Sequence, residues 1–147
     1  MISVLVYRFL IMLRRSLRLV ISSTVLSLLP VIAVVGSENP DFELEAGNEF
    51  YLHLHSQLQP LVINQIHSWH LELSNGIGAV QGASIDLIGG MPEHDHGLPT
   101  QPKVTAEIRP GVYLIEGIRF HMPGAWQMLF SIEVNGQTTN ATLDFHL

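Results

Sequence analysis

The sequence predicts an all-β protein, an antiparallel immunoglobulin-like β-sandwich of about seven strands that follows an N-terminal apolar helix. The first observation behind this prediction is a series of short segments in which apolar and polar residues alternate. The second is a turn signal between segments, at Asn75-Gly76, Pro110-Gly111 and Asn135-Gly136. The third is that these segments show no helical periodicity. Together they are typical of a sandwich of two antiparallel sheets.

Residues 1–36 are expected to be a signal peptide or a membrane anchor. Four arginines between residues 8 and 18 precede an uncharged, mostly apolar stretch at 19–35, an arrangement typical of export signals. That stretch is also at the lower edge of a membrane-spanning helix, which usually needs about 20 residues, so both interpretations stay open. Either one places residue 38 onward in the periplasm or on the outer face of the inner membrane, because the arginines stay on the near side.

The charge is distributed unevenly along the chain. Outside the N-terminal segment only Lys103, Arg109 and Arg119 are basic, against all thirteen acids, which gives a formal charge of −10 with neutral histidines. Such a surface repels phosphate backbones and attracts cations, so nucleic acid is excluded as a partner. The chain has no cysteine, which excludes disulfides, zinc fingers, thiolate copper sites and iron–sulfur clusters.

The first part of the exported region contains two clear strands. Residues 37–47 are expected to be an acidic linker that leads into a first short strand, with the sandwich domain at 48–147. Residues 50–56 alternate cleanly and predict a half-buried strand, and residues 66–74 do the same. The inward side chains are expected to be Phe50, Leu52 and Leu54 in the first strand and His67, Trp69, Leu71 and Leu73 in the second.

Five more strands are predicted in the second half of the chain. They span residues 83–88, 103–109, 113–119, 126–134 and 138–147, and the fourth of them has the clearest apolar face in the protein. The inward side chains are expected to be Val104, Ala106 and Ile108, then Trp126, Met128, Phe130, Ile132 and Val134, then Thr139, Ala141, Leu143 and Phe145.

The stretch Gly89–Pro99 (Gly-Gly-Met-Pro-Glu-His-Asp-His-Gly-Leu-Pro) combines a thioether, two imidazoles and two carboxylates. Its prolines and glycines exclude a regular helix or a central strand and predict a constrained surface loop. Imidazole and thioether ligands without thiolate suit copper, Cu(I) through methionine and Cu(II) through histidine. The carboxylates of Glu93 and Asp95 would also suit zinc, which accepts histidine and carboxylate in a tetrahedral set.

If the strands run antiparallel, every second loop falls at the same end of the sandwich. One end is therefore expected to collect His55, His67, residues 91–96, residues 121–122 and His146. His53 is expected two residues below this end, and only His70 well away from it. The candidate metal ligands are Met91, His94, His96, His121 and Met122.

The remaining histidines have more than one interpretation. On an extended backbone His53 and His55 project from one side, with Cα atoms roughly 6.5 to 7 Å apart, either as ligands of one metal or as a solvent-facing pair. His67 and His70 are expected to be histidines at the edge of the core with backbone hydrogen bonds. Residues 120–123 are either a loop that carries ligands or a strand crossover whose methionine packs in the core.

Three segments resemble the YtkA-like and FixH-like group of exported β-sandwich domains. They are residues 91–97 (Met-Pro-Glu-His-Asp-His-Gly), residues 110–113 (Pro-Gly-Val-Tyr) and residues 120–126 (Phe-His-Met-Pro-Gly-Ala-Trp). The resemblance implies a membrane-associated or periplasmic protein connected with copper handling, and in the FixH-like branch with assembly of a haem–copper oxidase. The residues that match the group's pattern are Met91, His94, His96 and Met122.

The leading hypothesis is an exported, non-enzymatic domain that holds or delivers copper, with zinc as the alternative metal. The alternative function is a membrane-tethered interaction or assembly module without its own metal, whose loops dock a partner such as a haem–copper oxidase or its assembly factors. An enzyme is the weakest hypothesis, because no nucleophile lies in a recognisable elbow or Gly-rich setting.

Overall fold

The computed structural model describes residues 39–147, so the signal peptide or anchor expected at 1–36 lies outside the described residues. The described part contains nine β-strands and one turn of 3-10 helix, η1. Their bounds are β1 Phe42–Ala46, β2 Phe50–Ser56, β3 His67–Asn75, β4 Ser84–Met91, η1 Pro92–His94, β5 His96–Gly97, β6 Lys103–Arg109, β7 Val112–Ile118, β8 Ala125–Val134 and β9 Gln137–His146. Within residues 39–147 no helix is long and apolar enough to cross a membrane.

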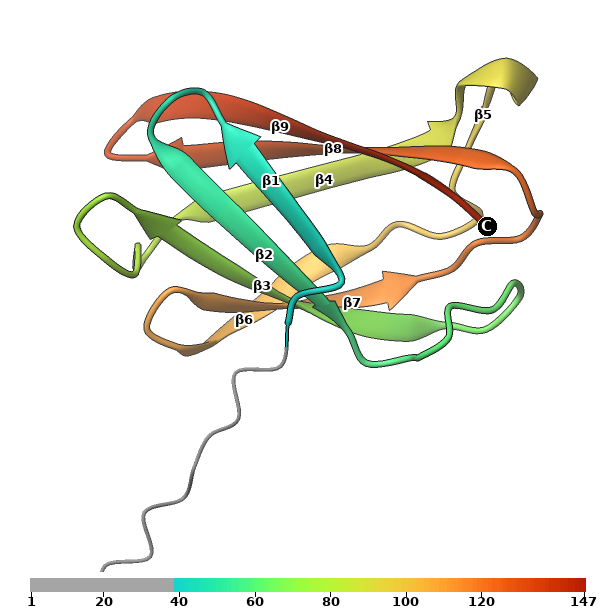
Figure 1. Ribbon diagram of the computed structural model, residues 1–147, viewed down its shortest axis with the longest axis horizontal. Helices are drawn as coiled ribbons and strands as arrows, with labels where there is room; N and C mark the ends of the chain where they lie inside the picture. Colours follow the sequence, from blue (N-terminus) through green and yellow to red (C-terminus); the bar gives the residue numbers. More distant parts are fainter. Residues whose placement is uncertain (1–38) are drawn as a thin grey trace, which may run out of the picture. The chain divides into compact units, whose positions relative to one another are not determined.

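The strands form two antiparallel sheets packed in two layers (Figure 1). One sheet has the order β1-β2-β3-β7-β6 and the other β5-β4-β8-β9. The all-β sandwich predicted from the sequence is therefore confirmed. Strand β1 lies within residues 37–47, the stretch expected to be a linker, and pairs with β2 along its whole length. The sheet thus begins earlier than the sequence indicated.

The core contains the apolar faces predicted for β2, β3 and β8. Their side chains with at most 1% exposure are Leu52, Leu54, Trp69, Leu71, Leu73, Trp126, Met128, Phe130 and Ile132. The fully buried ring of Phe120 joins two of these strands, because its centroid lies 6.2 Å from that of Trp69 and 5.0 Å from that of Trp126. Burial of each such side chain contributes roughly 1.5–3 kcal/mol, so this aromatic group stabilises the contact between the sheets.

Strand β6 differs from its prediction. Val104 is half-buried against the core, but Ala106 and Ile108 are exposed, the latter by 47%. The reason is that β6 is an edge strand whose register against β7 shifts twice, between Val104 and Ala106 and between Glu107 and Arg109. Each shift breaks the strict alternation on which the prediction depended.

The stretch Gly89–Pro99 is not the continuous loop that was predicted. Strand β4 continues to Met91 and pairs with both β8 and the short β5, so the irregular parts are the turn at 92–95 and the last two residues, Leu98 and Pro99. Glycine is required at positions 89 and 90 of this strand because neighbouring atoms leave no room for a side chain. A Cβ atom at Gly89 would collide with Sδ of Met128, and one at Gly90 would lie 2.7 Å from the carbonyl oxygen of His96.

The strand register brings distant segments to one end of the sandwich. Gly90 pairs with Gln127 across β4 and β8, and Ala125 pairs with His146 across β8 and β9. The turn after Met91 therefore lies beside the loop at 119–124 that joins β7 to β8 (Figure 1). This end, made of residues 91–97, residues 119–124 and the last residues of β9, is termed the histidine end. The opposite end, with the turns at 47–49, 76–83, 110–111 and 135–136, is termed the turn end.

Candidate functional site

Three of the five candidate ligands lie together at the histidine end. The imidazole rings of His94 and His96 stack with centroids 5.7 Å apart and planes 14° apart. The ring of His121 lies 5.0 Å from that of His96. His94 and His96 come from η1 and β5 of one sheet, whereas His121 comes from the loop between the sheets. The fold thus places imidazoles that are 25 residues apart in sequence in direct contact.

Two of these imidazoles have a buried nitrogen without a hydrogen-bond partner. The atoms are Nδ1 of His96 and Nδ1 of His121, and no described residue bonds to either. A buried polar atom left unpaired costs about 1–3 kcal/mol. Neutral imidazole nitrogen is also a common metal ligand. Two buried and unpaired nitrogens on neighbouring rings are therefore suited to coordinate an ion.

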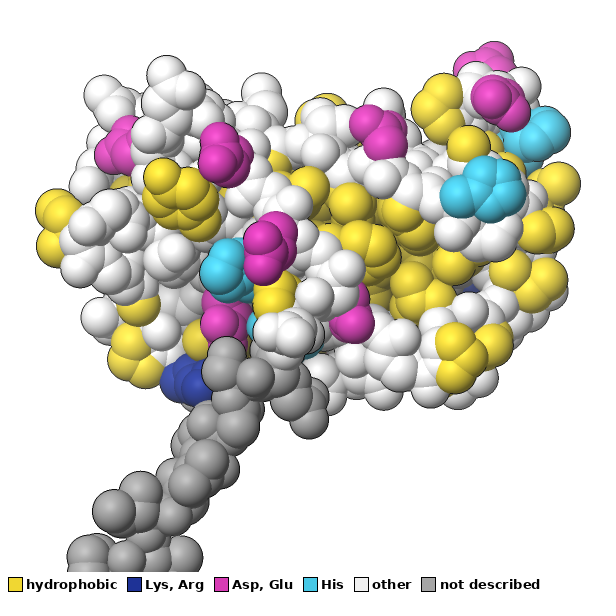
Figure 2. Space-filling view, viewed as in Figure 1, with side chains coloured by type: hydrophobic (Ala, Val, Ile, Leu, Met, Phe, Trp, Pro, Cys, Tyr) yellow, Lys and Arg dark blue, Asp and Glu magenta, His cyan; other side chains and the backbone are white. Residues whose placement is uncertain are grey.

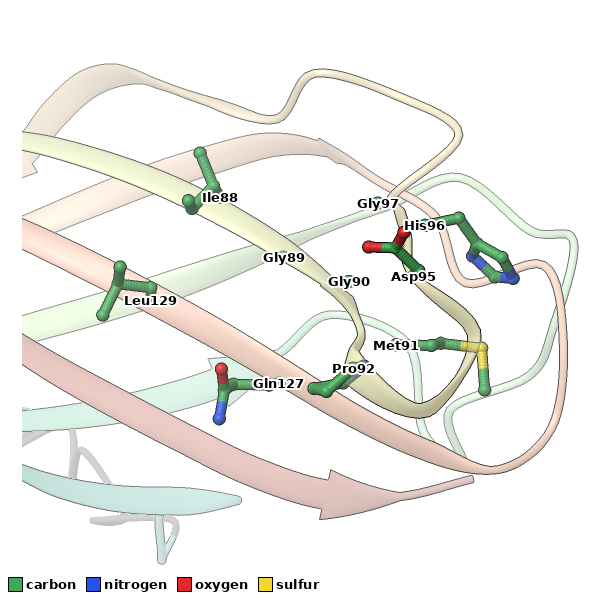
Figure 3. Close-up of a pocket in the computed structure, with 10 residues that line it drawn as sticks. All are labelled: Ile88, Gly89, Gly90, Met91, Pro92, Asp95, His96, Gly97, Gln127 and Leu129. Carbon is green, nitrogen blue, oxygen red and sulfur yellow. The ribbon is translucent and has the colours of Figure 1, made fainter.

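The thioether of Met91 is buried on the same side of the hairpin as the ring of His96. Met91 is 1% exposed and pairs with His96 across β4 and β5, so both side chains project from one face. Figure 3 shows the sulfur of Met91 and the imidazole of His96 directed to the same side. A Cβ atom at Gly124 would lie 2.9 Å from Cε of Met91, so the glycine lets the 119–124 loop approach this thioether.

Met122 lies at the surface of the histidine end. Its side chain is 36% exposed, so the interpretation in which it packs in the core is wrong, and Phe120 takes the core position instead. The carbonyl oxygen of Met122 accepts a hydrogen bond from Nε1 of Trp126 at 3.0 Å. The ring of Trp126 also meets the ring of His121 edge-on at 5.5 Å. Trp126, which the strand pattern predicts as a core residue, therefore also holds this loop in place.

The other histidines do not join this group. His67 lies at the histidine end but inside the core, where Nδ1 is 3.1 Å from the carbonyl oxygen of Gln65 and burial lowers the pKa of the ring below 6.5. His146 is exposed at the end of β9. His55 lies near the end of β2, as expected, but its side chain is on the outer face of the sheet because the neighbouring Leu54 fills the core. His70 was expected well away from this end, yet it is the strand partner of His55.

The carboxylates of the turn do not complete a metal site with the imidazoles. Glu93 and Asp95 are exposed, and Figure 3 shows Asp95 and His96 directed to opposite sides of the hairpin. Among residues 39–147, no three His, Cys, Asp or Glu side chains are grouped so that they could hold a metal ion. A metal held by His96 and His121 would therefore need a donor of another kind, and the thioether of Met91 is buried beside them.

On the opposite side of the hairpin, the surface of the four-stranded sheet is slightly hollowed. A cavity of about 400 Å³ is lined there by Ile88, Gly90, Asp95, Leu129 and neighbouring residues (Figure 3). Ile88 is 68% exposed and Leu129 is 37% exposed, and the two pair across β4 and β8. Met91 and His96 are also among the lining residues, so the cavity borders the imidazole group, although the ring of His96 is directed away from Asp95.

Comparison with known proteins gives one match. The profile of a family described as YtkA-like matches residues 49–130, which is more than half of the chain and includes all five candidate ligands. No curated protein and no solved structure matches. The FixH-like part of the resemblance stays a prediction.

Proposed function

Because the chain belongs to the YtkA-like family, whose members are generally exported β domains, we propose that it is a non-enzymatic copper-binding protein that holds or delivers the ion outside the cytoplasm. The proposed ligands are His96 and His121 through Nδ1, together with the thioether of Met91. One observation carries the proposal, the pair of buried Nδ1 atoms on neighbouring imidazoles to which no residue of 39–147 bonds.

The donor set favours copper over zinc. A thioether is a soft ligand, and a site with methionine, histidine and no thiolate suits Cu(I), whereas zinc prefers histidine with carboxylate or thiolate. The two carboxylates of the turn, Glu93 and Asp95, are exposed, and Asp95 points away from His96. Zinc would therefore lack the anionic ligand that this turn was expected to supply.

The outer residues of the cluster suit transfer of the ion. His94 is exposed and stacks on His96, and Met122 offers a second thioether at the surface. An ion can thus pass from an exposed imidazole or thioether to the buried set by exchange of one ligand at a time. The excess of acidic residues raises the local concentration of cations around the domain.

Titration calorimetry of the purified protein with Cu(I) under anaerobic conditions, and with Cu(II), tests the proposal. We expect one Cu(I) per chain in the buried set. His96→Ala and His121→Ala should each lower the Cu(I) affinity by more than the roughly 10–100-fold that loss of an outer-shell partner costs. His146→Ala is the matched control, because this histidine is exposed at the same end. Equal Cu(I) affinity in all four proteins would contradict the proposal.

A second function, docking of a membrane partner, is favoured by a group of exposed apolar side chains. Val62, Ile63 and Ile66 in the loop between β2 and β3 are 40–63% exposed. This loop is held against the histidine end, because the backbone N–H of Asn64 donates to the carbonyl oxygen of Phe120 at 2.6 Å. The apolar surface therefore adjoins the proposed copper site. Purification in mild detergent distinguishes the two functions, since a docking module retains its partner when His96 and His121 are alanine.

A further inference from the structure

We infer that the protein has a second metal site on the outer face of its five-stranded sheet, where His55 and His70 form a two-imidazole chelate for a divalent ion such as Cu(II) or Zn(II). The site shares no residue with the proposed Cu(I) site and does not depend on it. It also lies on a different sheet, because β2 and β3 belong to the sheet that lacks β4 and β5.

The strand register carries this inference. His55 and His70 are direct partners across the antiparallel β2 and β3. Their chain neighbours Leu54, Trp69 and Leu71 are fully buried, so both imidazoles must project from the opposite, outer face. Directly opposed residues have Cβ atoms about 4.5–5.5 Å apart, a spacing that allows two imidazole nitrogens to reach one ion at about 2.0–2.1 Å each.

The surroundings of the pair suit a cation. His53 lies on the same face two residues before His55, and its strand partners are Glu43 on β1 and Glu72 on β3. Glu72 is bound to Arg109 at 2.8 Å, whereas Glu43 is exposed. Figure 2 shows histidine and acidic side chains next to one another over this part of the surface. The negative charge favours a bound cation over a free one.

The number of protein ligands follows from the side-chain positions. Within the described residues, no three His, Asp or Glu side chains converge on one point. The site is therefore a two-imidazole chelate whose remaining positions hold water. His53 becomes a third donor only if its rotamer changes. A chelate of this kind binds its ion reversibly and exchanges it with other ligands.

Gln57 is the positioning residue for this site. The amide nitrogen Nε2 of Gln57 lies 3.2 Å from Nδ1 of His70. Histidines that bind metals usually donate their second ring N–H to an oxygen acceptor. A 180° turn of the amide would place its oxygen there as that acceptor, so that Nδ1 of His70 carries the proton and Nε2 is left free for the ion. Gln57→Ala should weaken binding without removing a ligand.

The test uses a parent protein with His96→Ala and His121→Ala, so that the proposed Cu(I) site is removed and only the outer face is measured. Titration with Cu(II), followed by electron paramagnetic resonance, should show one ion with two coordinated nitrogens. In this parent, His55→Ala or His70→Ala should lower the affinity on the order of tenfold or more and leave one coordinated nitrogen. His146→Ala should change neither.

Two outcomes would overturn the inference. One is unchanged Cu(II) affinity and nitrogen coordination in both the His55 and the His70 variants, and the other is loss of the signal in the His146 variant. His70→Gln serves as a second variant that keeps a polar contact with Gln57 if the alanine variant unfolds. Zn(II)-dependent shifts of the ring protons of His55 and His70 in NMR spectra provide a reading without any substitution. Failure of the Cu(I) site leaves this result unaffected, because the parent already lacks it.

Discussion

The two ends of the sandwich differ in how completely their buried polar groups are paired. At the turn end, the buried hydroxyl of Tyr113 donates to the carbonyl oxygen of Val80 and accepts from the N–H of Ala83, and the partly buried N–H of Gly111 donates to Glu107. Six buried side-chain atoms of the described residues have no partner, and all belong to the histidine end or to chain segments next to it. They are His67 Nε2, Trp69 Nε1, His96 Nδ1, Thr100 Oγ1, Arg119 Nε and His121 Nδ1.

This difference indicates what each end contributes. Satisfied buried polar groups are the rule in folded proteins, and each exception costs about 1–3 kcal/mol. The turn end follows the rule and stabilises the fold. The histidine end departs from it where the imidazoles meet, which is the departure expected of a site whose hydrogen-bond partners are replaced by a ligand.

The largest expected effect is that of Trp126→Ala. The indole is 1% exposed, packs against Phe120 and His121 and holds the backbone of Met122. Its removal should lower the free energy of unfolding by about 3–5 kcal/mol and also weaken Cu(I) binding, because the loop that carries His121 loses its support. Urea unfolding and Cu(I) titration measure the two effects.

A matched variant at the turn end is Tyr113→Phe. The buried hydroxyl of Tyr113 donates to the carbonyl oxygen of Val80 at 2.8 Å and accepts from the N–H of Ala83 at 3.0 Å. Its loss should lower the free energy of unfolding by about 1–3 kcal/mol and leave Cu(I) affinity unchanged. If Tyr113→Phe weakened copper binding as much as Trp126→Ala, the two ends would not be functionally distinct.

A smaller effect of opposite sign is expected for His121→Leu in the metal-free protein. This change removes the buried, unpaired Nδ1 atom and replaces it with an apolar group, so the free energy of unfolding should rise by about 1 kcal/mol. Under the proposed function, the same variant should lack the stabilisation that Cu(I) is expected to give the wild type. Urea unfolding with and without Cu(I) measures both changes. A less stable metal-free variant would mean that His121 stabilises the fold rather than binding an ion.

The smallest effect concerns pH. Burial lowers the pKa of His67 below 6.5, and the hydrogen bond to Gln65 opposes this shift only in part. The folded protein therefore binds a proton at His67 less readily than the unfolded chain does. The contribution of His67 to the free energy of unfolding is constant above pH 6.5 and falls as the pH drops below it, until the folded-state pKa is passed. His67→Phe should make the free energy of unfolding, measured with urea, depend less steeply on pH below 6.5. An unchanged pH dependence would mean that other groups cause it.

Much of the fold was predictable from local patterns. Alternation along β2, β3 and β8 identified the buried faces, and Asn135-Gly136 marked a two-residue turn that the structure confirms with φ angles of 52° and 76°. These features depend on neighbouring residues and on the period of a strand. Alternation predicted the wrong buried face for strand β6, because its irregular register against β7 cannot be inferred from its own sequence.

The candidate site was predictable only in outline. Alternating strand directions indicated that residues 91–96 and 121–122 would meet, but side-chain burial depends on the opposite strand. Gly89 was interpreted as a loop residue, since nothing in its sequence context shows that Met128 leaves no room for a Cβ atom. The partnership of His55 with His70 likewise depends on a register between strands that are joined by a long loop.

The most direct test of the central claim is X-ray absorption at the copper edge of the Cu(I)-loaded protein. The unpaired imidazoles and the buried thioether predict two nitrogen neighbours and one sulfur neighbour. The sulfur should disappear in Met91→Leu, and one nitrogen should disappear in either His96→Ala or His121→Ala. A copper shell of nitrogen and oxygen alone that none of these three substitutions alters would contradict the account.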